Sequence, residues 1–358
     1  IEGNIQEEDY AKLIKEFGTE PLSDELLERI KKHTGELHYL LRRKIFFSQR
    51  DLKWILDEYE KGNKFFLYTG RGPSGNVHLG HLMPWMLVKW LQDKFKANLY
   101  FQMTDDEKFL VNPKLSLEET RNYAYENALD VIALGFKPEL TKIIIDTENI
   151  KKLYPIALKV AKKLTFSTVK AVFGFDNSTN VGLAFFTSMQ SAPCFLEKKP
   201  CLIPLGIDQD PHFRITRDIA PKLGFSKPAL LHCKFAPGLG EGGKMSASQP
   251  ETAIFTTDSE KDDERKVRNA FTGGRETIEK QKKLGGMPEK CTVYHYLLYF
   301  FEQDDKVMQE KFKACKMGQT SCGNCKFKLA ETINKFLKEH QKKRELARNQ
   351  LDKFLLKE

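Results

Sequence analysis

Residues 65–81 read FFLYTGRGPSGNVHLGH, and this stretch predicts how the chain around it folds. Its first five residues form a short apolar and aromatic run, which is typical of a buried strand. Residues 70–75 hold three glycines and a proline, which favour neither a helix nor a strand. Asn76 is placed to cap a helix that carries His78 and His81 in its first turns. A strand, a glycine turn and a helix N-terminus in this order predict an anion site, because free N–H groups and the helix dipole point past the strand.

This glycine turn differs from the common phosphate loops. It lacks the GxxxxGK[ST] pattern, and its GxGxxG lettering contains Pro73 with no acidic residue ending a second strand nearby. His78 and His81 are three residues apart, which predicts one shared helical face, and Gly80 between them lets a ligand approach the backbone. Neutral imidazoles there can donate hydrogen bonds to phosphate oxygens. A structural helix start, with one histidine buried and one exposed, is the alternative interpretation of this tetrapeptide.

TGRGPSG followed by HLGH resembles the HIGH signature of class I aminoacyl-tRNA synthetases. The second signature of that class has its counterpart at residues 244–248, KMSAS, in the expected order and at a similar separation. Leu79 replaces the isoleucine of HIGH, which conserves volume. Ala247 stands where many members have a second lysine, so Lys108 or Arg71 is expected to supply that cation. Eukaryotic tryptophanyl-tRNA synthetases are similar in having KMSAS, which implies that activity is retained.

Residues 65–257 alternate between strand-like and helix-like patterns, which predicts an α/β fold with a doubly wound parallel sheet. The strands expected after the first one are 98–104, 142–146, 201–207, 230–235 and 253–256. Ligands of such sheets bind beyond the carboxyl ends of the strands. Polar residues follow three of the expected strands there, at 68–69, 102–108 and 208–210.

Four regions are expected along the chain. Residues 5–62 have mostly helical patterns and predict a helical N-terminal extension over 1–62, followed by a Rossmann-like catalytic domain over 63–257. Strand signals then stop, which predicts a helical C-terminal domain over 258–342 and a final helix over 343–358. The resemblance implies that the C-terminal domain contacts the anticodon and that the last helix returns to the catalytic domain. It also implies a homodimer that pairs through the catalytic domain.

Charge and cysteine content narrow the class of protein. The 358 residues carry a net charge of +9, and no apolar run reaches the roughly 20 residues of a membrane span. Residues 311–358 hold 13 Lys and Arg against 5 Asp and Glu, which predicts either a solvated helix face or attraction to a phosphate backbone. The seven scattered cysteines predict reduced thiols and a cytoplasmic protein. Cys315, Cys322 and Cys325 could instead bind zinc with His340 or His295, but no structural metal is expected.

Amino-acid activation joins a carboxylate to the α-phosphate of ATP and expels pyrophosphate, so positioning and charge stabilisation dominate. The resemblance implies four catalytic residues, His78, His81, Lys244 and Ser246. It implies ATP contacts, with Mg²⁺ accompanying the nucleotide, from Arg71, Gly72, His78, Gly80, His81, Lys108, Gly206, Asp208, Lys244, Met245 and Ser246. The glycines before Lys244 suit a loop that closes on the triphosphate. An ordinary flexible surface loop is the alternative interpretation of GEGGKMSAS.

The amino acid is indicated by QMTDDEK at 102–108, SMQSAP at 188–193 and GIDQDPHFRITRD at 206–218, which resemble eukaryotic tryptophanyl-tRNA synthetases. The resemblance implies that Tyr68 and Gln102 fix the indole N–H. It implies that the amino and carboxylate groups are held by Glu107, Gln190 and Gln209. The glutamines can also be ordinary loop residues, and Glu107 a salt-bridge partner of Lys108 or Arg71.

The resemblance therefore implies a ligase that forms Trp-AMP from L-tryptophan and ATP and transfers the aminoacyl group to tRNA(Trp). Three alternatives stay open, namely a tyrosyl-tRNA synthetase, a small-molecule nucleotidyltransferase, and a non-catalytic RNA-binding or signalling paralogue. A nucleotidyltransferase needs neither KMSAS nor a basic helical tail. Intact His78, His81 and Lys244 argue against a non-catalytic paralogue.

Overall fold

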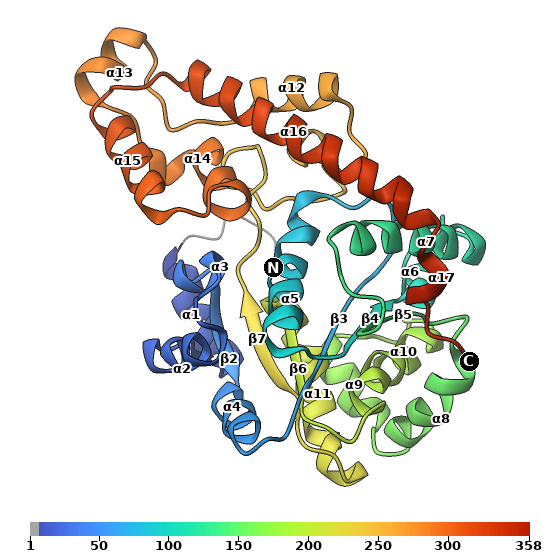
Figure 1. Ribbon diagram of the computed structural model, residues 1–358. Helices are drawn as coiled ribbons and strands as arrows, with labels where there is room; N and C mark the ends of the chain where they lie inside the picture. The colour runs from blue at the N-terminus through green and yellow to red at the C-terminus, as the bar shows by residue number, and fades with distance from the viewer. Residues whose placement is uncertain (1–6) are drawn as a thin grey trace.

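The computed structural model describes residues 7–358, so residues 1–6 of the expected N-terminal extension lie outside it. A seven-stranded sheet with the order β1-β2-β7-β6-β3-β4-β5 lies between two layers of helices (Figure 1). The strands are β1 (Glu20–Pro21), β2 (Phe46–Arg50), β3 (Phe66–Arg71), β4 (Leu99–Met103), β5 (Thr141–Ile145), β6 (Cys201–Gly206) and β7 (Ala229–Cys233). The strands from β7 to β5 run parallel, which confirms the predicted α/β class.

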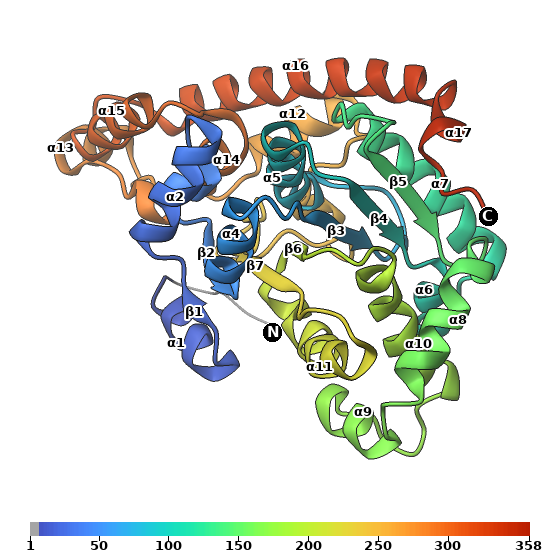
Figure 2. The same ribbon diagram turned by 60° about the horizontal axis from the view of Figure 1, so that its bottom comes forward.

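Alternate residues of the strands enter different cores, as period-two side-chain placement requires. Leu67 and Phe101 join a large core on one face, whereas Phe66 and Tyr68 join a smaller core on the other. The helices of this part of the chain are α5 (Leu79–Phe95), α6 (Asp105–Val111), α7 (Leu117–Ala133), α8 (Ile150–Ala161), α9 (Phe166–Phe173), α10 (Val181–Ser191) and α11 (Asp210–Ile219). Helices α5 and α7 cover the first face, and α8, α10 and α11 cover the second (Figure 2).

The N-terminal region is helical only in part. Its helices are α1 (Glu7–Phe17), α2 (Asp24–Thr34), α3 (Tyr39–Arg42) and α4 (Leu52–Glu60). Between them, β1 and β2 extend the sheet, with β2 antiparallel to β7. The prediction of a helical extension is therefore wrong at residues 46–50, because Ser48 pairs with His232 far along the chain. The strand expected at 253–256 is also wrong, since Phe255 forms only an isolated bridge with His78.

Beyond residue 258 the chain is helical, as expected. The helices are α12 (Glu260–Arg268), α13 (Ile278–Leu284), α14 (Thr292–Tyr296), α15 (Asp305–Lys316), α16 (Cys322–Arg348) and α17 (Leu351–Phe354). Helix α16 continues through residues 342 and 343, so no break separates a final helix at 343. It runs from the lobe formed by α13 and α15 to α7 (Figure 2). Across residues 7–358, none of these helices combines the length and apolar character that crossing a bilayer requires.

The chain returns to the sheet after α17. Leu355 forms a parallel bridge with Ile143 of β5, and the Leu356 N–H donates to the Ile143 carbonyl at 2.8 Å. The Asn149 side chain donates to the Leu356 carbonyl at 2.8 Å. The residues that follow α17 therefore lie along the outer edge of β5.

Strands β3 and β6 part at their carboxyl ends. Their pairing stops after Leu67 and Leu202, whereas β3 and β4 stay paired as far as Arg71 and Met103. From β3 the chain continues to β4 and β5 on one side, and β6 and β7 lie on the other. Ligands of open α/β sheets bind at such a switch point.

Candidate active site

A cleft of about 470 Å³ lies at the switch point between β3 and β6. Its lining includes every residue that the sequence analysis assigned to substrates or catalysis, namely Tyr68, Arg71, Gly72, His78, Gly80, His81, Gln102, Glu107, Lys108, Gln190, Gly206, Asp208, Gln209, Lys244, Met245 and Ser246. These residues come from segments up to about 180 positions apart, and the fold brings them to one cavity. The lining also includes apolar residues that the sequence analysis did not single out, Met83, Ile203, Leu205 and Phe213.

The two histidines lie at the start of α5. The predicted cap at Asn76 is wrong, because α5 begins at Leu79 and His78 is its N-cap residue. Just before it, the Thr256 N–H donates to the Val77 carbonyl at 2.9 Å. The His78 N–H donates to Nδ1 of His81 at 3.1 Å. The two rings stack with 3.5 Å between their centroids and 25° between their planes.

Burial keeps both imidazoles uncharged. Desolvation, with a smaller effect of Arg71, lowers the pKa of His78 to about 3. Desolvation also lowers the pKa of His81 well below its usual value. Burial lowers the pKa of Arg71 to about 10, so this guanidinium remains a cation at neutral pH. The site thus presents neutral donors beside a buried positive charge, which suits a phosphate group.

Arg71 is fixed by three polar contacts. Its Nε donates to Oδ1 of Asn127 on α7. Its Nη2 donates to the carbonyls of Gly75 at 3.2 Å and Asn76 at 3.1 Å. Asn127 also donates to the Gly75 carbonyl, at 3.0 Å. The glycine turn is therefore fastened to α7 through Arg71.

The KMSAS segment folds back towards the histidines. The Met245 N–H donates to the Ala236 carbonyl at 2.9 Å, and the Gly80 N–H donates to Sδ of Met245 at 3.1 Å. Lys244 Nζ lies 5.0 Å from the centre of the Phe235 ring and lines the same cleft as His78. The two distant signatures therefore converge in one cavity.

A buried polar network forms the floor of the cleft. The Tyr68 hydroxyl lies 2.5 Å from Oε1 of Gln102 and 2.9 Å from the Gln190 carbonyl. Gln102 Nε2 donates to Asp146 at 2.8 Å, and Asp146 shares a hydrogen bond with Asp106. Burial, followed by the Asp106 charge, raises the pKa of Asp146 well above its usual value, and burial raises that of Asp106 to about 6. The side-chain Oε1 of Gln190 is buried without a hydrogen-bond partner.

The sequence analysis missed both aspartates of this network. Asp146 ends an expected strand at 142–146, so its place at a carboxyl end was an available signal. Glu107 forms a salt bridge with Lys108, which was the alternative interpretation of this residue, and Lys108 Nζ lies 2.8 Å from its Oε1. Gln209 donates to Asp208 at 3.2 Å.

A preformed metal site is absent from residues 7–358. In the part of the chain from residue 7 onward, no three His, Cys, Asp or Glu side chains are arranged to hold a metal ion. His340, weighed as a zinc ligand, hydrogen-bonds to Asp130 at 2.8 Å. The His340 side chain is therefore hydrogen-bonded to α7.

Comparisons with known proteins show the family to which the chain belongs. Residues 60–338 match the family described as tRNA synthetases class I (W and Y). The tryptophan–tRNA ligase of Pyrobaculum aerophilum is 54% identical over 354 residues, which cover 97% of this chain and 94% of the relative. The tryptophanyl-tRNA synthetase from Giardia lamblia has a TM-score of 0.91 at 36% identity and covers 100% of this chain and 99% of its own.

A third relative is a crystal structure of a tryptophanyl-tRNA synthetase from Encephalitozoon cuniculi bound to tryptophan. It has a TM-score of 0.89 at 36% identity, and the match covers 97% of this chain and 98% of that chain. The chain is therefore similar to the Pyrobaculum ligase as well as to the synthetases from Giardia and Encephalitozoon. The chain therefore belongs to the class I tRNA synthetases (W and Y), among their tryptophan–tRNA ligases.

Proposed function

We propose that the cleft between β3 and β6 forms Trp-AMP from L-tryptophan and ATP and then transfers the aminoacyl group to tRNA(Trp). The observation that carries the proposal is the convergence of His78, His81 and Lys244 on one cavity. Neutral donors at a helix N-terminus and an exposed lysine on a glycine-containing loop match a reaction in which charge builds up on phosphate oxygens.

The nucleotide end of the cleft is assigned to the two signatures. His78 and His81 donate to phosphate oxygens, Gly80 lets the phosphate approach the backbone, and Lys244 and Ser246 close over it. Arg71 and Lys108 add positive charge, in place of the second lysine that the KMSAS segment lacks. Gly72 leaves room for the Lys108 side chain, since a Cβ at residue 72 would lie 2.0 Å from Cε of Lys108. The adenosine rests near Gly206 and Asp208, where a Cβ on Gly206 would lie 2.6 Å from Oδ1 of Asp208.

Mg²⁺ is proposed to enter as part of the substrate, bound to the ATP phosphates. Among residues 7–358 no cluster of metal-ligating side chains is preformed, so the protein supplies no cage of its own there. Triphosphate-bound Mg²⁺ commonly keeps several waters and needs few protein carboxylates.

The amino-acid end is assigned to the buried network. The lining residues Ile203, Leu205 and Phe213 form an apolar wall for an indole ring. The Tyr68 hydroxyl and Oε1 of Gln102 accept the indole N–H, which a tyrosine side chain does not provide. The tryptophan amino and carboxylate groups are assigned to Glu107, Gln190 and Gln209. The unpartnered Oε1 of Gln190 supports this, because a buried acceptor without a donor suits a bound ammonium group.

We assign the tRNA to both parts of the chain, with the acceptor end at the cleft and the anticodon on the helical region over 258–342. The excess of Lys and Arg over 311–358 supports attraction to a phosphate backbone. We also propose a cytoplasmic location, which the assignment of a tRNA substrate and the free cysteines support.

A homodimer through the catalytic domain is supported by exposed apolar side chains on α6, α8, α9 and α10. These are Phe109, Val111, Ile150, Tyr154, Leu158, Phe166, Val172 and Val181. Light scattering tests this. We expect twice the 41.3 kDa chain mass for the wild type and a monomer for the Tyr154→Lys/Leu158→Glu double variant. The matched control is Leu346→Glu, at an exposed position of α16, and it should stay dimeric.

ATP–pyrophosphate exchange, measured with each amino acid separately, tests the proposed reaction. Exchange that depends on tryptophan is expected, followed by charging of tRNA(Trp). Exchange with tyrosine alone would assign the chain to the tyrosine enzymes. No exchange with any amino acid, alongside retained RNA binding, would assign it to a non-catalytic paralogue.

A further inference from the structure

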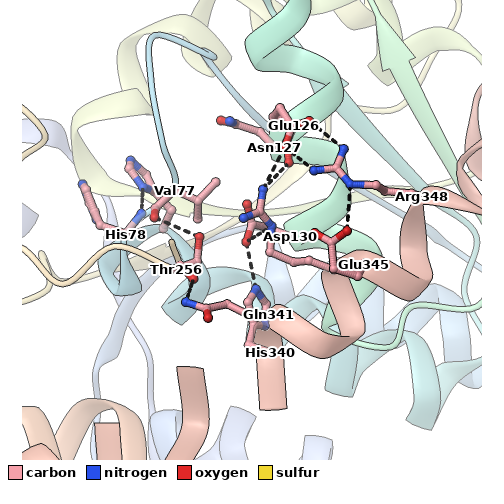
Figure 3. Close-up of polar contacts among 12 residues, drawn as sticks. Val77, His78, Glu126, Asn127, Asp130, Thr256, His340, Gln341, Glu345 and Arg348 are labelled. Carbon is pink, nitrogen blue, oxygen red and sulfur yellow. Dashed lines mark hydrogen bonds and ion pairs between the residues drawn. The ribbon is translucent and has the colours of Figure 1, made fainter. Parts of the chain in front are cut away.

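Helix α16 turns several polar side chains towards the body of the protein. His340 is 3% exposed and Arg344 is 8% exposed, and Gln341 is half-buried. The same helix already buries Leu337 and Ala347, and an apolar stripe is sufficient to dock an amphipathic helix. The polar contacts therefore need a separate explanation. Figure 3 shows that they reach two different places, Asp130 on α7 and Thr256.

The first set of contacts runs from α16 through α7 to the glycine turn. His340 Nε2 lies 2.8 Å from Oδ1 of Asp130, and both side chains are buried. One helical turn earlier on α7, Asn127 accepts from Arg71 and donates to the Gly75 carbonyl at 3.0 Å. Two further ion pairs join the same helices, Arg344–Glu126 at 3.2 Å and Arg348–Glu126 at 2.8 Å.

The second set of contacts runs from α16 through residues 256–258 to Val77, the residue before His78. Gln341 Nε2 donates to the carbonyls of Thr256 at 3.0 Å and Asp258 at 2.9 Å. Thr256 in turn donates to the Val77 carbonyl, from its N–H at 2.9 Å and its hydroxyl at 3.2 Å. Val77 directly precedes His78, so this chain of hydrogen bonds ends at the first histidine of the signature (Figure 3).

We propose that His340 and Gln341 are positioning residues for the nucleotide end of the active site. They hold the segment of residues 75–78 between α7 and residues 256–258, and so fix where the His78 ring meets ATP. The segment includes a glycine and an exposed asparagine, so buried apolar contacts alone do not determine its position. A displacement of about 1 Å at a reacting group can change a rate by roughly 100-fold. The inference rests on the proposed function, and it assigns a catalytic consequence to a helix outside the catalytic domain.

Gln341→Met tests the second set of contacts, because it removes the two hydrogen bonds and keeps length and helix propensity. The matched control is Gln350→Met, the same change at an exposed glutamine nine residues further along the chain. In ATP–pyrophosphate exchange we expect Gln341→Met to raise KM for ATP about 5- to 20-fold and to leave KM for tryptophan within about twofold. The control should leave both constants unchanged.

A pair of substitutions at His340 tests the first set. His340→Leu removes the contact with Asp130 and should also raise KM for ATP selectively. His340→Gln keeps a side-chain N–H that can donate to Asp130, and it should restore the wild-type constant. Gln341 is half-buried, so its variant gives a result even where His340→Leu does not fold.

A simple docking role predicts different results. A lower melting temperature with an unchanged KM for ATP in Gln341→Met, or an equal rise in both Michaelis constants, would overturn the positioning proposal. A wild-type chain without tryptophan-dependent exchange would overturn the proposed function alone. Positioning is then decided by the rise in melting temperature on adding ATP, which Gln341→Met should reduce and Gln350→Met should preserve.

Discussion

The N–H of Gly80 donates a hydrogen bond to Sδ of Met245 at 3.1 Å, across 165 residues of sequence. This contact joins the helix that starts with the histidine pair to the loop that carries Lys244. Met245 is 7% exposed although its neighbours Lys244 and Ala247 are exposed. The loop is therefore anchored at one residue while its lysine stays accessible.

Met245→Ala is expected to loosen this loop. Truncating a buried Met typically costs about 2–5 kcal/mol, and here the cost falls mostly on the anchoring of one loop. Trypsin should then cut after Lys244 at least about tenfold faster, and KM for ATP should rise. Met245→Leu retains the apolar volume and should show a smaller effect, and Ser248→Ala should match the wild type. Cleavage at the wild-type rate in Met245→Ala would contradict an anchoring role.

Lys244→Met should remove a charge that acts mainly on the developing pyrophosphate. A single preorganised group of this kind typically contributes roughly 100- to 1000-fold to kcat. We expect a loss of that size in exchange, with KM for tryptophan nearly unchanged. Because the residue is exposed, the melting temperature should stay constant, as it should for Lys222→Met, the surface control. A loss of less than about tenfold would rule out this role for Lys244.

Tyr68→Phe should impair tryptophan binding selectively. It leaves Oε1 of buried Gln102 without the hydroxyl that now lies 2.5 Å away. An unpaired buried acceptor costs about 1–3 kcal/mol, so KM for tryptophan should rise roughly tenfold while KM for ATP stays constant. Tyr100→Phe removes a hydroxyl that contacts Glu197 outside the cleft and serves as the control. Equal rises in both Michaelis constants would contradict the assignment.

The histidine pair should give no titration near pH 6.5. The pKa of His78 is lowered to about 3 by burial, and that of His81 is lowered well below its usual value. Because kcat/KM reports the ionisation of the free enzyme, its value for ATP should not change between pH 5.5 and 8 through these residues.

The matching control is His78→Asn, normalised to its own maximum, since ionisation of ATP affects both profiles alike. An inflection near pH 6.5 in the wild type that is absent from His78→Asn would contradict the prediction. For stability the sign is the same as for a paired carboxylate, whose pKa is also lower in the folded state than in the unfolded state. A depressed histidine pKa means that the unfolded state binds the proton first, so stability from these residues falls as pH drops below about 6.5.

The sequence predicted those elements whose signals are local. The apolar run, the glycines and the spacing of His78 and His81 lie within residues 65–81, and the structure has a strand and a helix there. Strand β2 was missed because its partner β7 lies far along the chain, as the Ser48–His232 contact shows. The apolar residues at 253–256 form no strand, because they pair with the start of α5 and not with the sheet.

The lining of the cleft was predictable for a different reason. Parallel strands bring their carboxyl ends together, so polar residues that follow separate strands meet. Asp146 was overlooked although it follows such a strand, since its importance depends on burial and on Gln102 reaching it. The contacts of His340 and Gln341 could not be predicted either, because the sequence around these residues gives no sign of the distant segments that they contact.

The residues after α17 have a consequence for self-association. Leu355 and Leu356 occupy the outer side of β5, and at the opposite end of the sheet β1 is only 2 residues long. A bare edge strand is a template on which a second molecule can add its own strand. Deleting residues 355–358 is therefore expected to leave the fold intact and to make the protein aggregate on gentle warming.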